Sequence, residues 1–72
     1  MVDDSVITGK VKAALVADPT TKAHEISVET FKGVVQLSGF VDSTEARSRA
    51  TQVAQQVEGV KQVKNALELR NN

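Results

Sequence analysis

The stretch GVVQLSGFVDSTEA, residues 33–46, decides the fold, because it places an extended segment directly before the start of a helix. Every second residue shares one face of that segment, namely Val35, Leu37, Gly39 and Val41. The two glycines also invite an interpretation as a phosphate-binding loop. A P-loop requires GxxxxGK[ST], and a dinucleotide site requires GxGxxG between a strand and a helix. Neither spacing occurs here, so the stretch predicts a strand followed by a helix cap.

Polar residues after this strand predict where the helix begins. The segment Asp42-Ser43-Thr44-Glu45 fits a capping box, in which Asp42 accepts a hydrogen bond from the helix backbone and Glu45 bonds back to the cap. Apolar residues then recur at helical spacing over residues 43–58: Ala46, Ala50, Val53, Ala54 and Val57. Gly59 follows where a helix C′ glycine is common. We therefore expect a helix over 43–58, with Asp42 and Gly59 as structural residues at its ends.

Segments on both sides complete a small domain. Residues 4–17 carry one apolar helical stripe, which an Asp-Pro pair ends because the residue before proline avoids the α region. Residues 25–30 alternate as a strand, and Phe31-Lys32-Gly33 predicts a turn with a positive φ at Gly33. Gly39 is expected to permit a bulge or the close approach of a helix. Residues 60–69 alternate as a third strand.

The predicted element order is therefore α-β-β-α-β. A right-handed crossover makes the second and third strands parallel, whereas the hairpin is antiparallel. We expect an α+β fold, in which two helices pack on one face of a three-stranded mixed sheet and the other face is open to solvent. The 72 residues fit a single domain, residues 1–72, with a core over about 4–69.

Composition limits the functions of such a domain. Nine Lys and Arg balance nine Asp and Glu, whereas nucleic-acid-binding domains usually carry a basic excess, so we expect no nucleic-acid partner. The chain has no cysteine and one histidine, His24, and no serine has a histidine partner at a suggestive position. We therefore predict no catalytic residues, metal site or cofactor. No apolar run approaches the roughly 20 residues of a membrane span, and MVDDSV has no signal-peptide features.

Four patterns follow one another in this chain: Ile26-x-Val28, then Gly33-x-Val35-x-Leu37-x-Gly39-x-Val41, then Ala46 and Ala50, then Val57-x-Gly59-Val60-x-x-Val63-x-Asn65-x-Leu67. In this order and spacing they resemble the BON domain, named for bacterial OsmY and nodulation proteins. The resemblance extends from about Asp4 to Leu69. It implies the same α-β-β-α-β fold and a non-catalytic module.

The resemblance also implies a setting. BON domains are associated with phospholipid or membrane-surface binding and with periplasmic proteins induced by osmotic stress. They often occur in tandem or beside other domains, so we expect a domain of a larger protein in the periplasm or envelope. The resemblance assigns no ligand-contact residue. It leaves open a weak lipid-binding module, a protein-interaction or chaperone-like module that binds envelope proteins, and a sensor of a small ion or osmolyte.

Two surfaces are candidates for these roles. Lys61, Lys64 and Arg70 lie near the third strand and are the predicted contacts to anionic phospholipid, at about 1 kcal/mol for each basic residue. The open sheet face offers a predicted protein-interaction surface: Val34, Gln36 and Phe40. An edge strand offers a second way to bind protein.

Two further polar residues have predicted structural roles. Asn65 falls on the core side of the third strand, where a buried amide needs hydrogen-bond partners. Arg49 is expected to pair with Glu45 at i,i+4 on the wet side of the second helix.

Overall fold

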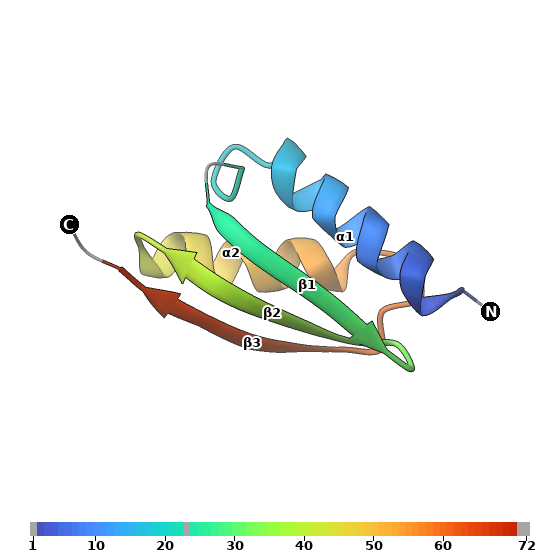
Figure 1. The fold of residues 1–72 in the computed structure, drawn as a ribbon. Helices are drawn as coiled ribbons and strands as arrows, with labels where there is room; N and C mark the ends of the chain where they lie inside the picture. The colour runs from blue at the N-terminus through green and yellow to red at the C-terminus, as the bar shows by residue number, and fades with distance from the viewer. Residues whose placement is uncertain (1, 23, 71–72) are drawn as a thin grey trace.

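The computed structural model describes residues 2–22 and 24–70, so the predicted domain limits at 1 and 72 lie outside the described residues. Its elements are α1 (Asp4–Ala17), β1 (Glu25–Phe31), β2 (Val34–Val41), α2 (Thr44–Gln55) and β3 (Gln62–Leu69), as Figure 1 shows. The strand order is β1-β2-β3, with β1 antiparallel to β2 and β2 parallel to β3. This arrangement confirms the predicted α+β fold with a mixed sheet.

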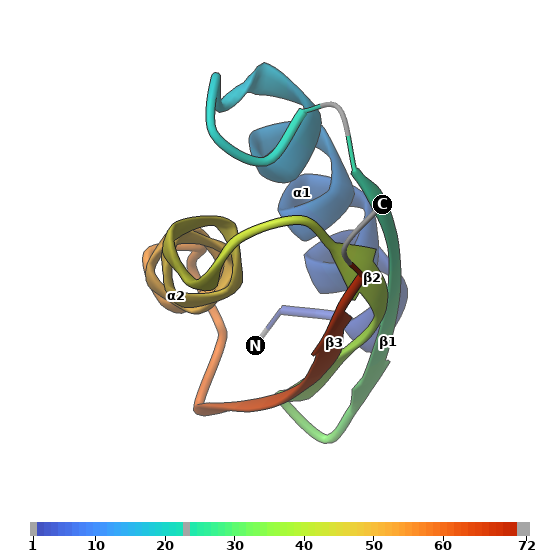
Figure 2. The same cartoon turned by 90° about the vertical axis from the view of Figure 1, so that its left-hand side faces the viewer.

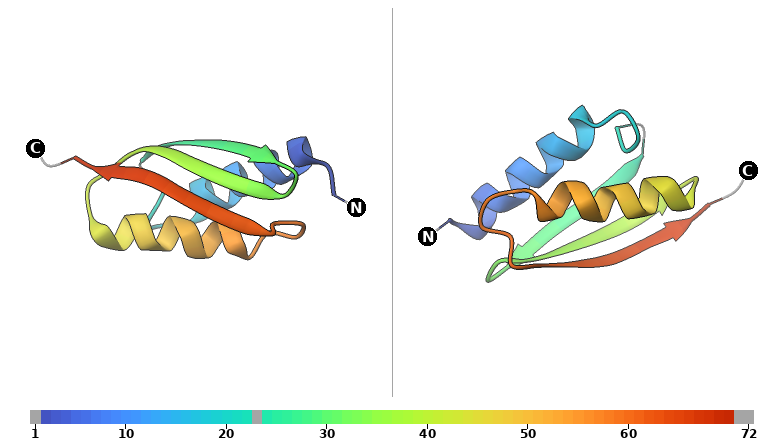
Figure 3. Two further views of the ribbon diagram at one scale, coloured as in Figure 1. Left: turned by 90° about the horizontal axis from the view of Figure 1, so that it is seen from below. Right: turned by 180° about the vertical axis from the view of Figure 1, so that it is seen from behind.

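Both helices cover the same face of the sheet, and the end-on view in Figure 2 shows the opposite face bare. Helix α1 buries Ile7, Val11 and Leu15, which recur every fourth residue along one stripe. The remaining core residues come from α2 and the three strands: Val28, Val35, Leu37, Val41, Ala46, Ala50, Val53, Ala54 and Leu67. Three of the buried residues of α2 are alanines, whose short side chains allow close packing, and Figure 3 shows this helix lying over the sheet.

Helix α2 begins one residue later than the capping-box pattern predicted. Ser43 is the N-cap, and its Oγ accepts the Ala46 N–H at 3.1 Å. The extended backbone of Ser43 (φ −151°, ψ 156°) aims this hydroxyl at the free N–H groups of the first turn. The prediction of Asp42 as the cap was therefore wrong. Asp42 instead lies with Oδ1 3.3 Å from His24 Nε2.

The same helix ends earlier than predicted, at Gln55 rather than residue 58. Val57 N–H donates to the Ala54 carbonyl, and Val60 N–H donates to the Val57 carbonyl, each at 3.2 Å. These short-range bonds form turns, so Gly59 is a turn residue with φ 94° rather than the helix C′ residue. The predicted placement of Gly59 at the helix end was wrong.

Gly39 allows two strands to approach closely. It has φ 124°, and a Cβ at this position would lie 2.1 Å from the Glu25 carbonyl oxygen. The neighbour is thus the backbone of β1, not a helix, which corrects that part of the prediction. Any side chain here would both strain the backbone and push the two strands apart.

Candidate functional site

The hairpin turn between β1 and β2 is fixed by the first residue of α1. Lys32 and Gly33 both have positive φ, 50° and 83°, as in a two-residue type I′ turn. The Asp4 carboxylate accepts the Lys32 N–H at 2.7 Å and the Gly33 N–H at 3.0 Å. This pair of bonds, the Asp4 clamp, offsets the cost of left-handed backbone at Lys32. Phe31, which was predicted in the turn, belongs to β1 and pairs with Val34.

Around this turn lies a surface that we name the hairpin-end surface, made of Phe31, Lys32, Lys61 and Lys64. Phe31 is 71% exposed, and Lys32 Nζ lies 5.4 Å from the centroid of its ring. Lys61 N–H donates to the Gly33 carbonyl at 2.8 Å, which ties the segment before β3 to the turn. Two stretches far apart in the sequence, residues 31–32 and 61–64, therefore bring an exposed aromatic ring and three lysines to one end of the sheet.

Two shallow grooves flank the hairpin end, and Lys32 lines both. The first lies between the α1 N-terminus and the segment before β3, where Lys61 and Glu58 also line it. The second lies over the open sheet face, where Lys64 and Glu29 line it together with Phe31. Asp3 and Asp4 also line the first groove, so its carboxylates outnumber its lysines, whereas the second groove has two lysines and one carboxylate. The positive potential is therefore stronger on the side of the open sheet face.

Arg70 lies apart from the two lysines with which it was predicted to act. Lys64 and Arg70 are six residues apart, which is roughly 20 Å along an extended chain. The Arg70 guanidinium carbon lies 3.9 Å from the centroid of the Phe40 ring. The backbone N–H of Arg70 donates to the Val41 carbonyl. The structure therefore brings Lys61 and Lys64 together with Lys32 at the hairpin end and places Arg70 at the opposite end of β3.

The predicted interaction residues Val34, Gln36 and Phe40 all lie on the open sheet face. Phe40 is 41% exposed, Gln36 is exposed, and Val34 is half-buried. In register, Gln36 lies between Glu29 of β1 and Lys64 of β3. This face therefore carries charges of both signs between its apolar side chains rather than a continuous apolar patch.

Asn65 connects β3 to α2. Its Nδ2 donates to the Arg47 carbonyl at 2.8 Å and to Thr51 Oγ1 at 2.6 Å, and its Oδ1 accepts the Leu67 N–H at 3.0 Å. Three of the four hydrogen-bonding positions of this carboxamide are occupied by the protein itself. The side chain is therefore positioned to hold the helix on the strand.

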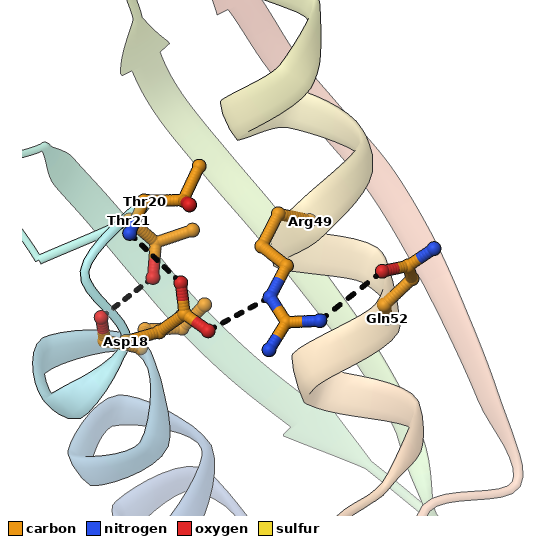
Figure 4. A network of polar contacts seen from close by, with 6 residues as sticks. Asp18, Thr20, Thr21, Arg49 and Gln52 are labelled. Carbon is orange, nitrogen blue, oxygen red and sulfur yellow. Dashed lines mark hydrogen bonds and ion pairs between the residues drawn. The ribbon is translucent and has the colours of Figure 1, made fainter.

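A polar network links the end of α1 to the middle of α2 (Figure 4). Arg49 Nε donates to Asp18 Oδ2 at 2.7 Å, and Arg49 Nη1 donates to Gln52 Oε1 at 3.3 Å. Asp18 Oδ1 accepts the Thr20 N–H at 2.9 Å, and the buried Thr21 hydroxyl donates to the Leu15 carbonyl at 2.6 Å. Arg49 thus reaches across to α1, not along its own helix to Glu45 as predicted.

This network shifts the acidity of Asp18. The hydrogen bond from Arg49 is the largest influence and lowers the pKa of Asp18 below its usual value near 3.8, with help from the Thr20 and Thr21 N–H groups. Burial acts in the opposite direction, because it disfavours the charged carboxylate. The fold therefore stabilises the ionised carboxylate of Asp18 over its protonated form.

Metal-ligating side chains do not gather within residues 2–22 and 24–70. No group of three or more His, Cys, Asp or Glu side chains in this part of the chain is arranged to hold a metal ion. His24, the one histidine of the chain, lies beside Asp42. Among the same residues, neither helix has the length and apolar character to span a membrane.

A model of the BON domain matches residues 3–71 of the chain. The chain belongs to the BON domain family. This BON domain is 51% identical over 69 residues to the osmotically-inducible protein Y of Escherichia coli (strain K12), covering 96% of this chain and 34% of that protein. It is 33% identical over 69 residues to the "uncharacterized protein in gshII 5'region" of Anaplasma centrale, covering 96% of this chain and 46% of that protein. The BON domain thus spans between a third and a half of these relatives.

A solved structure shares the fold at low sequence identity. The C-terminal domain of CdsD, the structural protein of the type III secretion system of Chlamydia trachomatis, superposes with a TM-score of 0.74 at 22% identity, covering 96% of this chain and 34% of that chain. At this identity the likeness concerns the arrangement of helices and strands alone. The family and the fold are therefore established.

Proposed function

We propose that this BON domain is a non-catalytic binding module of the bacterial cell envelope that makes weak contact with anionic phospholipid through the hairpin-end surface. The observation that carries the proposal is the convergence of three lysines at the hairpin end. Lys32 lies over the exposed Phe31 ring, Lys64 lines the same groove, and Lys61 lines the groove on the other side of the turn. Lysines favour an anionic surface, and phenylalanine is among the apolar side chains that insert at the headgroup boundary. The printed name of the Escherichia coli relative supports a role under osmotic stress, in the periplasm or at the envelope, within a larger protein.

The expected binding is weak. Each lysine near an anionic surface contributes about 1 kcal/mol, so three contribute about 3 kcal/mol. Asp3, Asp4, Glu29 and Glu58 line the same grooves and reduce this sum, because carboxylates repel an anionic surface. A single domain would therefore exchange rapidly on and off a membrane, and neighbouring domains of a larger protein would add their own contacts.

The Asp4 clamp suits this role. It binds the turn through backbone N–H groups alone, which leaves the Lys32 ammonium group free of the Asp4 carboxylate. The turn is held rigid, so Phe31 and Lys32 project from a fixed position rather than a flexible loop. Pre-ordering of a binding surface lowers the entropy cost of contact.

A vesicle co-sedimentation assay tests this function. The domain is mixed with phosphatidylglycerol or phosphatidylcholine vesicles in about 0.01 M and about 0.15 M salt, conditions between which the screening length falls from roughly 30 Å to roughly 8 Å. We expect binding to phosphatidylglycerol alone, and less of it at the higher salt.

A matched pair of variants locates the surface. Lys64→Gln should lower binding by roughly five-fold, the equivalent of about 1 kcal/mol. Arg70→Gln, on the same strand but stacked on Phe40, should leave binding unchanged. Equal binding to both lipids, or a larger loss with Arg70→Gln, would contradict the proposal.

A further inference from the structure

The outer edge of β1 presents backbone groups that the protein does not use. Phe31 and Val34 close the two-residue turn, and in such a hairpin the closing pair exchanges hydrogen bonds. Because strand residues alternate in direction, Ile26, Val28 and Thr30 aim their N–H and C=O groups away from β2. None of the hydrogen bonds found among residues 2–22 and 24–70 uses these outward backbone groups.

The opposite edge of the sheet is different, because Asn65 closes it. The Arg70 N–H points to β2, where it donates to Val41, so the alternation directs the Leu67 N–H to the outer edge of β3. That N–H is already taken by Asn65 Oδ1, and the carboxamide is fixed to α2 through Arg47 and Thr51. A strand that approached β3 would find the middle of its edge occupied. The edge available for strand addition is therefore that of β1.

Charge indicates what would bind there. On the open face β1 displays Glu25 and Glu29, both exposed, and neither forms an ion pair within the described part of the chain. Across β2 their register partners are Phe40 and Gln36, which carry no charge. A strand added at the other side would place its side chains about 5 Å from each glutamate. Two unpaired carboxylates four residues apart favour a partner with two cations at the same spacing.

We propose that the β1 edge binds an extended polypeptide segment with Lys or Arg four residues apart, which adds to the sheet as a fourth strand. The outward backbone groups of Ile26, Val28 and Thr30 supply main-chain hydrogen bonds, and the two glutamates select the basic sequence. This inference is independent of the lipid surface, because the lysines of the hairpin end take no part in it.

The test is an amide-resolved NMR titration of the domain with two synthetic ten-residue peptides. One peptide alternates Thr and Val and carries two lysines four residues apart; the other has glutamate at both lysine positions. We expect the basic peptide to shift the amides of Ile26, Val28 and Thr30 and to slow their hydrogen exchange. The acidic peptide should bind at least ten-fold more weakly, because each facing charge pair changes from attraction to repulsion.

A charge-matched pair of variants distinguishes a local effect at the β1 edge from an effect of the net charge of the domain. The variant Glu25→Lys/Glu29→Lys should reduce affinity for the basic peptide by at least ten-fold. The control Glu45→Lys/Glu58→Lys changes two exposed glutamates outside the sheet by the same net charge and should reduce affinity by less than three-fold, in line with screened long-range attraction. Dispersed spectra for both variants verify that each is folded.

Three results of the peptide titrations would overturn the proposal. They are equal binding of the acidic and basic peptides, equal loss of affinity in both double variants, and shifts centred on β3 instead of β1. Self-association of the domain through β1 without peptide would also overturn it, because the occupant would then be a second copy. The vesicle assay of the lipid surface is unaffected by any of these outcomes.

Discussion

Asp4→Ala should destabilise the domain by about 1–2 kcal/mol more than Asp3→Ala does. The Asp4 carboxylate accepts two backbone N–H groups of the turn, at 2.7 and 3.0 Å. A hydrogen bond to a charged group contributes about 1.5–3 kcal/mol when buried. The Lys32 amide is exposed and the Gly33 amide is partly buried, so water can replace the carboxylate as their acceptor in the variant. The two bonds together are therefore expected to contribute less than two buried bonds would, about 1–2 kcal/mol.

Asp3 provides the matched control for this prediction. It occupies the N-cap position of α1, but its side chain makes no capping hydrogen bond. Both variants remove one negative charge near the same helix N-terminus, where such a charge contributes about 0.3–1 kcal/mol. The difference between them therefore isolates the clamp on the turn.

The assay is urea unfolding followed by circular dichroism, with a thermal melt as a second measure. For a domain of this size each kcal/mol corresponds to about 4–8 °C, so Asp4→Ala should melt about 5–15 °C below Asp3→Ala. In NMR spectra the amides of Lys32 and Gly33 should shift in the Asp4 variant alone. Equal stability of the two variants would refute the clamp.

Three other substitutions test the fold. Gly39→Ala forces a Cβ to within 2.1 Å of the Glu25 carbonyl and should cost about 3 kcal/mol or more; a melting temperature like that of the wild type would contradict the close strand approach. Asn65→Leu leaves the Leu67 N–H without its partner and should cost about 1–3 kcal/mol, and it should also cause concentration-dependent association in sedimentation experiments, because the β3 edge is no longer closed. Asp18 has a lowered pKa in the folded state, so its stabilisation is present above its unfolded pKa and is lost as the pH falls through the folded pKa; Asp18→Asn should flatten this acid-side loss in thermal melts, and an unchanged pH profile would contradict the ion pair.

Hydrophobic spacing was sufficient to predict the element order of this chain. The alternation over 34–41 and the apolar stripe over 4–17 correspond to β2 and α1 without change of limits. Each pattern has one period and one buried face, so it determines both the element and the side that packs. The right-handed crossover then leaves a single simple topology for the sheet.

The end of α2 was harder to predict for a physical reason. Val57 continues the apolar spacing of the helix and packs against the core, but it does so from a turn that follows Gln55. Apolar spacing reports which side chains are buried, and a turn can bury one as well as a helix. Limits of elements are therefore less certain than their existence.

Contacts between distant polar residues had no sequence signal. Asp4 reaches a turn 28 residues later, and Asp18 meets Arg49 across 31 residues. Spacing within one helix offered Arg49 a nearer partner, Glu45, and no local pattern connects Asp4 to the hairpin turn. The position of Arg70 relative to Lys64 was different, because the rise of an extended strand alone would have separated them.

The most direct test of the lipid surface compares two triple variants in their partition onto phosphatidylglycerol vesicles. One neutralises the hairpin end and the other neutralises three exposed lysines elsewhere: Lys32→Gln/Lys61→Gln/Lys64→Gln and Lys10→Gln/Lys12→Gln/Lys22→Gln. Both lose three positive charges, so net charge is the same. We predict that the hairpin-end variant binds roughly 100-fold more weakly than the wild type, the equivalent of about 3 kcal/mol, and that the control binds within a few-fold of it. An equal loss in the two variants, or no loss in the first, would contradict the proposed surface.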